Sequence, residues 1–302
     1  MVASIQNTMA YIRSFVTNLR LELLFVSASC ALAGMAYGSQ TNRLYFLVSF
    51  LAFFLSYGFG KSLTDELSKP QRNFHTIKVN GIGLVACAAV IAIINPWNII
   101  FAGVSILALC GYVALKKKSL LTGPIYLGIV IALLPAMGLL SMGGQLAETL
   151  RPKLIWLYVF TIFSFGNLLL MSQLKAIQTD RKLGFKTIPA ILGWTKAVIV
   201  GDFFVVLSIA AAGMMINYAD TFALLVFIAG SLVGIAGQIA AHITSKRGKN
   251  VSTFIISTTL RSFVLWHVAV FIGERSEWLI FACAFYFLFE VSLKLKVNSD
   301  EN

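Results

Sequence analysis

The chain has 302 residues, of which 58% are hydrophobic and only 12% are charged, and its mean hydropathy is +0.84. A soluble domain carries roughly a quarter charged residues, so this composition excludes an ordinary soluble protein and also a collagenous, disordered or disulfide-stapled one. Long apolar runs recur along the chain, each close to the roughly 20 residues that a helix needs to cross a bilayer. The sequence predicts an all-α, polytopic membrane protein.

The first 20 residues carry Arg13 and Arg20 but no uninterrupted apolar core and no small-residue cleavage site, so we expect no signal peptide. Met9, Ile12 and Phe15 fall on one side of this stretch, as in an amphipathic segment that lies on the membrane. Ten predicted spans follow, at about 21–38, 43–60, 77–96, 98–115, 120–141, 153–173, 194–217, 221–243, 251–272 and 276–294.

Lys and Arg residues are divided unevenly between alternate loops. Nineteen of them lie in the terminal segments and the loops on that side, four lie on the opposite side, and Arg261 lies within a predicted span. Cytoplasmic loops are enriched in Lys and Arg, so both termini are predicted to face the cytoplasm. The net charge of +12 then reflects topology and attraction to anionic lipid headgroups, with no need for a nucleic-acid partner.

Two predicted cytoplasmic loops, 61–78 and 173–196, mix acidic with basic residues, and their preceding spans run in the same direction. Asp65 and Asp180 supply carboxylate oxygens, which suit Mg²⁺ bound together with substrate phosphates. Arg and Lys side chains bind phosphate oxygens directly. The two loops are therefore a predicted binding site for a molecule with a diphosphate head and a lipid tail. The alternative is that they are plain cytoplasmic loops with exposed ion pairs of little energetic value.

Both loops also carry a distinctive order of residues. Residues 180–193 read DRKLGFKTIPAILG, which is an aspartate followed by Arg-Lys, a glycine, a Lys-Thr-Ile-Pro turn and a Leu-Gly. Residues 65–72 read DELSKPQR, an acidic pair followed by a polar residue, a proline and an arginine. These motifs, their separation and the predicted cytoplasmic position of both loops resemble the UbiA superfamily of intramembrane prenyltransferases.

The resemblance implies a UbiA-like bundle of nine to ten transmembrane helices around a central cavity. In the family, two aspartate-rich loops hold Mg²⁺ ions that bridge an isoprenyl diphosphate, and an aromatic or other acceptor attacks the allylic cation left when the diphosphate departs. We therefore expect residues 1–302 to form a single transmembrane domain. Because the family more usually has nine spans, either residues 276–302 supply an extra span and a cytoplasmic tail, or the segment 251–272 does not cross the membrane.

The sequence departs from the family at positions that carry the chemistry. Tyr57 and Lys61 stand where the first motif has an asparagine and an aspartate, and Gln173 and Ala176 stand where the second has aspartates. The metal ligands that remain are Asp65 and Asp180, so at most one Mg²⁺ ion is expected. The predicted catalytic residues are Asp65 and Asp180; direct diphosphate ligands are Lys61, Arg72, Lys175, Arg181, Lys182 and Lys186; further motif positions are Tyr57, Ser68 and Gln173.

Ionisable residues within spans deserve a functional hypothesis by default. Asp202, Glu22 and Glu290 lie near predicted cytoplasmic ends, where snorkelling or local pairing accounts for them. Arg261 is expected to reach a phosphate or to pair with Glu290, and His267 to be a hydrogen-bonded interior residue.

Three functions remain open at this point. The first is a divergent prenyltransferase that transfers an isoprenyl group to an aromatic or lipid acceptor at the cytoplasmic membrane border. The second is a catalytically impaired family member that binds or presents a polyprenyl or quinone lipid. The third is a transporter, for which paired Gly or Pro breaks near the bilayer midplane are expected, and the midspan Pro135 offers little of that pattern. No sequence feature identifies the acceptor.

Overall fold

The computed structural model describes residues 21–40, 42–67, 73–115, 118–120, 123–216, 220–244 and 251–301, and contains no strand within them. The predicted amphipathic segment at 1–20 lies outside the described residues. The helices are α2 (Leu21–Met35), α3 (Arg43–Leu67), α4 (Phe74–Ile94), α5 (Asn98–Leu115), α6 (Pro124–Ile131), α7 (Leu133–Ser141), α8 (Pro152–Leu174), α9 (Ile177–Lys182), α10 (Ile188–Gly213), α11 (Thr221–Thr244), α12 (Val251–Glu274) and α13 (Leu279–Glu301).

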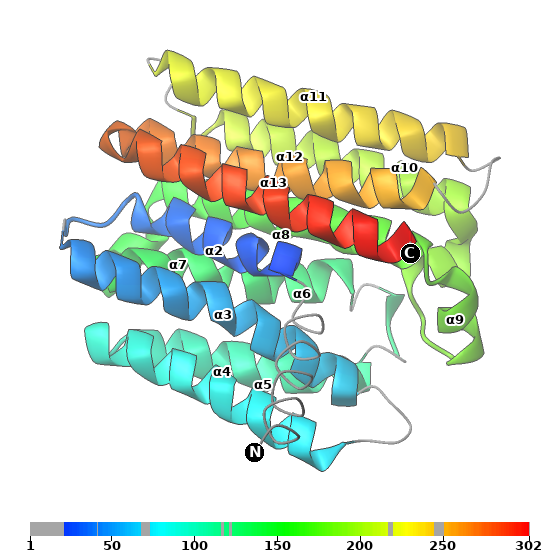
Figure 1. Ribbon diagram of the computed structural model, residues 1–302, viewed down its shortest axis with the longest axis horizontal. Helices are drawn as coiled ribbons and strands as arrows, with labels where there is room; N and C mark the ends of the chain where they lie inside the picture. The colour runs from blue at the N-terminus through cyan, green and yellow to red at the C-terminus, as the bar shows by residue number, and fades with distance from the viewer. Residues whose placement is uncertain are drawn as a thin grey trace, which may run out of the picture.

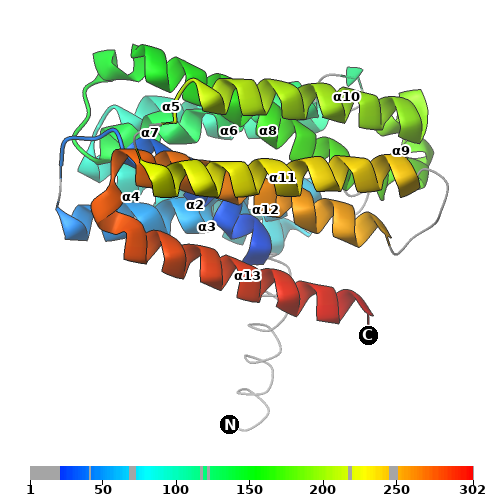
Figure 2. The ribbon, with the colours of Figure 1, turned by 90° about the horizontal axis from the view of Figure 1, so that it is seen from above.

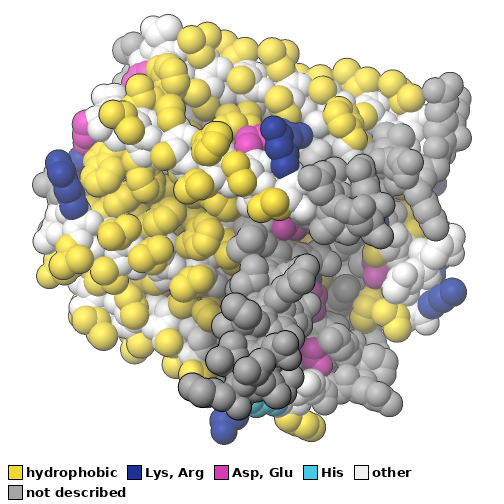
Figure 3. Space-filling view, viewed as in Figure 1, with side chains coloured by type: hydrophobic (Ala, Val, Ile, Leu, Met, Phe, Trp, Pro, Cys, Tyr) yellow, Lys and Arg dark blue, Asp and Glu magenta, His cyan; other side chains and the backbone are white. Residues whose placement is uncertain are grey.

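The long helices lie side by side along one axis and form an up-and-down bundle (Figures 1 and 2). The helix pairs in most extensive contact are α11 with α12, α8 with α10, α3 with α4, α2 with α7 and α6 with α8. Apolar side chains cover most of the described surface of one face (Figure 3), which is the surface that a helical bundle presents to lipid. Side chains that a soluble protein would bury are therefore exposed on the outer helices; Ile93, Leu107 and Ile280 are examples.

Within the described residues, eight helical segments are long and apolar enough to cross a membrane, and α2 and α5 are shorter apolar helices. Each of the ten predicted spans contains one of these helical segments, with α6 and α7 together occupying the fifth. The predicted all-α, multi-span architecture is confirmed.

The sequence predicts that the second span ends at residue 60, which is earlier than the helix ends in the structure. The structure continues α3 beyond residue 60 to Leu67, so residues 61–67 are helical and the predicted loop 61–78 is much shorter than expected. The predicted loop 173–196 likewise contains α9 and the first two turns of α10. Hydropathy shows where the apolar side chains end, but it does not show where the helix ends. The backbone hydrogen bonds of a helix can continue past the apolar side chains into the headgroup region.

The fifth predicted span is broken into α6 and α7 just before Pro135, whose ring removes a backbone N–H donor and opposes a continuous helix. Here α7 packs closely on α2 through two glycines. A Cβ atom added at Gly138 would lie 2.2 Å from the Ala31 carbonyl oxygen, and one added at Gly34 would lie 1.9 Å from that of Pro135. The two backbones approach this closely because both contact positions lack a side chain.

Helix α12 lies at the centre of the bundle, although its sequence is rich in Ser and Thr. Of its apolar window, 83% is buried, the highest share among the eight candidate spans. Several of its hydroxyl groups bond within the helix: Thr258 Oγ1 donates to the Phe254 carbonyl, and Thr259 Oγ1 donates to that of Ile255. His267 is fully buried, with Nδ1 2.8 Å from the Phe263 carbonyl oxygen, so the expected interior histidine is confirmed.

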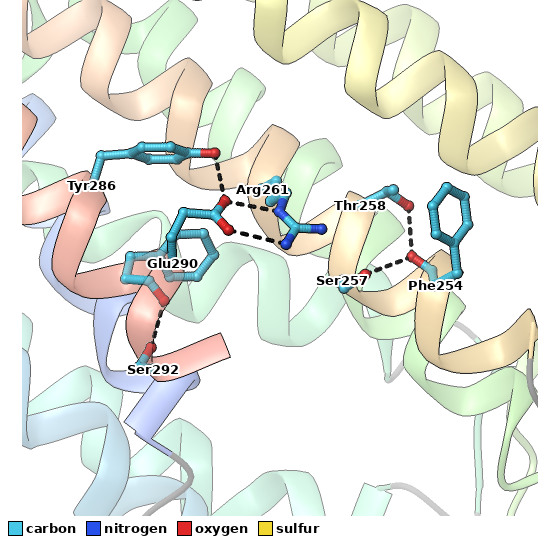
Figure 4. Close-up of polar contacts among 8 residues, drawn as sticks. Phe254, Ser257, Thr258, Arg261, Tyr286, Glu290 and Ser292 are labelled. Carbon is cyan, nitrogen blue, oxygen red and sulfur yellow. Dashed lines mark hydrogen bonds and ion pairs between the residues drawn. The ribbon is translucent and has the colours of Figure 1, made fainter. Parts of the chain in front are cut away.

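Helix α13 is joined to α12 by a bidentate ion pair (Figure 4). Arg261 Nε and Nη2 donate to the two carboxylate oxygens of Glu290 at 2.8 and 3.0 Å, and the Tyr286 hydroxyl donates to the same carboxylate at 2.7 Å. The pairing alternative predicted for Arg261 is therefore the one that the structure shows. The pair couples the last helix to the bundle.

We expect the single substitution Arg261→Leu to destabilise the protein by about 2 kcal/mol, because it leaves the partly buried Glu290 carboxylate without its cation. The double variant Arg261→Leu/Glu290→Leu should recover much of the loss, because neither charge then remains. Thermal unfolding of both variants in lipid nanodiscs is the measurement. A single variant at least as stable as the double would show that the pair does not secure α13.

Candidate active site

An apolar cavity opens among helices α2 to α8. Its empty volume is about 850 Å³, including open space at its mouth, and its wall is built from successive turns of α3, α4, α5 and the α6–α7 pair. Ser27 and Ser56 on the wall both donate to the Phe53 carbonyl, at 2.7 and 2.8 Å, which leaves little polar surface toward the interior. The cavity suits a long hydrocarbon chain.

The mouth of the cavity holds a cation and a carboxylate from one helix. Lys61 lines the cavity together with Tyr57 and Thr64 of α3, and its ammonium forms an ion pair with Asp65 one turn further on. The side chains of Lys61 and Asp65 are 32% and 51% exposed, so the pair is accessible from the aqueous side. The charged groups lie where the apolar lining ends.

Glu66, the neighbour of Asp65, has a structural role. Its side chain is buried and accepts a hydrogen bond of 2.8 Å from the backbone N–H of Asn73. Asn73 in turn caps α4 by accepting hydrogen bonds from the N–H groups of His75 and Thr76. Glu66 therefore joins the end of α3 to the start of α4.

The second motif folds into the short helix α9 and a tight turn. The N–H of Phe185 bonds to the Asp180 carbonyl and the N–H of Gly184 to that of Arg181, the two bonds of a Schellman motif. Gly184 has a φ of +69°, a backbone conformation that residues with a Cβ atom rarely adopt. The glycine in DRKLGF is thus required by the turn that ends α9.

This turn places Thr187 beside Asp180. The Asp180 side chain is only 5% exposed, and it accepts a hydrogen bond of 2.9 Å from Thr187 Oγ1. Thr187 is the N-cap residue of α10, but its hydroxyl group serves Asp180 instead of the helix. Sequence reasoning missed this contact, although Thr187 lies within the quoted motif.

Arg181 joins α9 to the kinked start of α10. Its Nε donates to the Ala190 carbonyl at 2.8 Å, just before Gly193, which interrupts α10 with φ of +79°. Lys175 donates to Thr253 Oγ1 at 3.2 Å, and Lys182 and Lys186 are exposed. Two predicted site residues, Ser68 and Arg72, lie outside the described residues.

Gln173, one of the two positions at which the resemblance led us to expect an aspartate, lies near the end of α8. It is 7% exposed, and its Oε1 is buried with no hydrogen-bond partner among the described residues. A Cβ atom added at Gly123 would lie 2.9 Å from its Nε2, so the start of α6 packs against this amide. A neutral amide thus stands near α9 in place of a carboxylate.

The end of α3 and helix α9 lie at the same end of the bundle, on the right in Figure 1. Tyr112 of α5 lines the cavity there. Sequence reasoning did not single out Tyr112. The signal is present, because the cavity-lining residues 102, 105, 109 and 112 follow one helix face that ends with this tyrosine.

The donor set at this end does not fit a pair of Mg²⁺ ions. Within the part of the chain that the structure describes, no group of three or more His, Cys, Asp or Glu side chains is placed to hold a metal. The Asp65 carboxylate interacts with an ammonium group, and Asp180 interacts with a hydroxyl. Lys61, which stands where the resemblance led us to expect a metal-ligating aspartate, would repel a divalent cation and attract a diphosphate.

A model of the UbiA prenyltransferase family matches residues 75–264. The chain belongs to this family. The matched residues run from the start of α4 into α12 and include the second motif. No curated protein matches the chain significantly.

Solved UbiA homologues share the fold at low sequence identity. An apo UbiA homologue from Aeropyrum pernix K1 has a TM-score of 0.63 and 16% identity, over 80% of this chain and 96% of the homologue. A digeranylgeranylglyceryl phosphate synthase has a TM-score of 0.60 and 16% identity, over 87% and 98%. An Archaeoglobus fulgidus UbiA homologue bound to GPP and Mg²⁺ has a TM-score of 0.50 and 15% identity, over 85% and 99%. These likenesses establish a UbiA-type helical bundle.

Proposed function

We propose that this chain transfers an isoprenyl group from a prenyl diphosphate to an aromatic or lipid acceptor at the cytoplasmic membrane border. The observation that carries the proposal is the Lys61–Asp65 pair at the mouth of an apolar cavity, in a chain of the UbiA family. A diphosphate would remain beside these charged groups while its hydrocarbon tail enters the cavity. The proposal includes a single transmembrane domain with both termini in the cytoplasm.

The proposed diphosphate ligands are cationic side chains from both motifs. Lys61 approaches from α3, and the second motif contributes the remaining described cations at the same end of the bundle. Charge-assisted hydrogen bonds from ammonium and guanidinium groups to phosphate oxygens are short and strong. The proposed ligands are Lys61, Arg72, Lys175, Arg181, Lys182 and Lys186, with Asp65 and Asp180 as catalytic carboxylates and Tyr57, Ser68 and Gln173 as further motif positions.

In the proposed reaction the bond between the allylic carbon and the diphosphate oxygen breaks, and the electron pair leaves with the diphosphate. The cationic side chains stabilise the charge that develops on this leaving group. The allylic cation forms next to the Tyr57 and Phe165 rings, which pack edge to face at 6.4 Å on the cavity wall. Ring faces attract cations. The acceptor then forms the new bond and releases a proton to the aqueous side.

A second function is favoured by the same ion pair. Lys61 neutralises Asp65, one of the two proposed catalytic carboxylates, and Gln173 is neutral where the resemblance implies an aspartate. A family member that has this headgroup site but does not catalyse the transfer would bind or present a polyprenyl or quinone lipid. The two functions share the cavity and differ in whether diphosphate is released.

Diphosphate release from geranylgeranyl diphosphate, measured with purified protein and a panel of aromatic and lipid acceptors, distinguishes them. We expect release that falls at least tenfold in Asp180→Asn, because the amide still accepts the Thr187 hydrogen bond but lacks the charge. Asp202→Asn is the matched control, since Asp202 pairs with His242 instead. Binding without release would support lipid presentation, and neither binding nor release would refute both functions.

A further inference from the structure

The apolar cavity ends in polar residues at its far end from Lys61. On α4 the lining positions 84, 88 and 91 are followed on the same face by Asn95; on α5 the stripe that includes Ala102 is preceded by Asn98. On α7 the lining positions 134 and 137 are followed by Ser141. These spacings of three or four residues keep each polar residue in line with the lining residues of its helix. The cavity-lining faces of α4, α5 and α7 therefore each end in a polar side chain, and these side chains lie at the same depth.

Asn98 and Ser141 are joined by a hydrogen bond, and all three side chains bond to backbone carbonyls of the surrounding helices. Asn98 Nδ2 donates to the Ile91 carbonyl at 3.1 Å and lies 3.0 Å from Ser141 Oγ. Ser141 Oγ donates to the Met137 carbonyl at 2.8 Å, and Asn95 Nδ2 donates to the Leu140 carbonyl at 2.9 Å. Ile91 and Met137, whose side chains line the cavity, thus hold the polar residues through their backbones.

Burial makes this layer a barrier. Asn98 is 0% and Ser141 1% exposed, and Asn98 Oδ1 has no hydrogen-bond partner among the described residues. Beyond the layer lies a second pocket of mixed polarity, lined by Asn95 and Ser141 together with Trp97 and Gln145. The layer of Asn95, Asn98 and Ser141 therefore separates an apolar space from a polar one, and we call it the polar floor.

We propose that the polar floor limits the length of the isoprenyl chain that the cavity accepts, to about three or four isoprene units. The inference rests on the proposed function, because it assumes a prenyl tail in the cavity with its head at Lys61. A longer tail would have to displace buried hydrogen bonds or leave sideways into the bilayer. Displacing them strands polar groups in an apolar space, which is costly.

The depth of the cavity sets the expected length. Lining residues run from Tyr112 to Ala102 on α5 and from Thr64 to Ala52 on α3, which at the helical rise is about 15 and about 18 Å. An isoprene unit adds four bonds to the chain, and three bonds of an extended chain span at most about 3.6 Å, so one unit spans about 5 Å. Farnesyl and geranylgeranyl tails fill this depth.

Two variants move the floor in opposite directions. Ala102→Phe fills the cavity one turn above Asn98 and should shift the preferred chain toward geranyl. Asn98→Leu keeps the branched shape but removes the polar atoms, so a longer chain no longer has to strand the Asn98 amide and should be admitted. Leu107→Phe is the matched control, because Leu107 lies on the same helix, is 74% exposed and faces away from the cavity.

The experiment compares nonhydrolysable prenyl thiodiphosphates of two to nine units, by competition binding to the full chain in nanodiscs. We expect an affinity at least tenfold weaker for six or more units than for four, a loss of this difference in Asn98→Leu, and a shorter optimum in Ala102→Phe. Equal affinity for all lengths, or an unchanged profile in Ala102→Phe, would overturn the inference.

Failure of the proposed function gives a different result. If no thiodiphosphate binds at any length, the headgroup site is refuted, and prenyl alcohols of the same lengths then probe the cavity alone through thermal stabilisation. If thermal stabilisation stops increasing at alcohols of three or four units, the inference about the polar floor would stand although the proposed transferase function had failed. Stabilisation that does not depend on length would remove the floor as well.

Discussion

Lys61→Asp is expected to make prenyl thiodiphosphate binding depend on Mg²⁺. The substitution replaces a cation by a carboxylate one helical turn before Asp65, so two carboxylates share one face at the mouth of the cavity. Paired carboxylates attract a divalent cation that bridges to a diphosphate, and they repel the diphosphate itself when that cation is absent. Calorimetric titration of the variant, with Mg²⁺ and with a chelator, measures the effect.

Lys61→Ala isolates the contribution of the ammonium group. We expect diphosphate binding to weaken by about 1–3 kcal/mol, the range for a charge-assisted hydrogen bond. Lys153→Ala is the control, because Lys153 pairs with Glu274 and takes no part in the proposed site. Unchanged binding in Lys61→Ala would mean that Lys61 only extends to the aqueous phase.

Gly138→Ala should destabilise the fold by about 3 kcal/mol. Its Cβ would meet the Ala31 carbonyl oxygen at 2.2 Å, so α7 and α2 would have to separate. A glycine in a helix with open space around it behaves in the opposite way, because alanine is the better helix former. Gly103→Ala on α5 is such a control, with nothing within 4 Å of the added atom, and should be neutral or stabilising.

Thermal unfolding of both glycine variants in the same nanodiscs compares the two effects. The expected result is a lower midpoint for Gly138→Ala and an equal or higher one for Gly103→Ala. Equal midpoints would show that the α2–α7 contact adjusts without loss, and that the close approach of the two backbones does not secure the bundle.

The long helices could be predicted because their signal is local. Each apolar run of about 20 residues contains a helical segment in the structure. The end of α3 could not, because the residues from Lys61 onward are charged and hydropathy does not distinguish a helix that leaves the membrane from a loop. The burial of the Ser- and Thr-rich α12 was similarly hard to predict, because hydroxyl groups such as those of Thr258 and Thr259 bond to carbonyls of their own helix and so tolerate the centre of the bundle.

The candidate site divides in the same way. The spacing of Lys61 and Asp65 predicts their contact, because residues four apart meet on a helix. The approach of Thr187 to Asp180 depends on the turn at Gly184, and the polar floor depends on how α4, α5 and α7 pack. Contacts of this kind join residues through tertiary structure, and no periodicity in a single sequence reports them.

The central claim is that this member of the UbiA family binds prenyl diphosphate through cationic side chains with little need for Mg²⁺. Calorimetric titration of the unmodified protein with geranylgeranyl thiodiphosphate, in Mg²⁺ and again in a chelator, tests it most directly. We expect binding in both conditions, with two affinities that differ by no more than about tenfold, which is about 1.4 kcal/mol. Binding in Mg²⁺ that disappears in the chelator would contradict it.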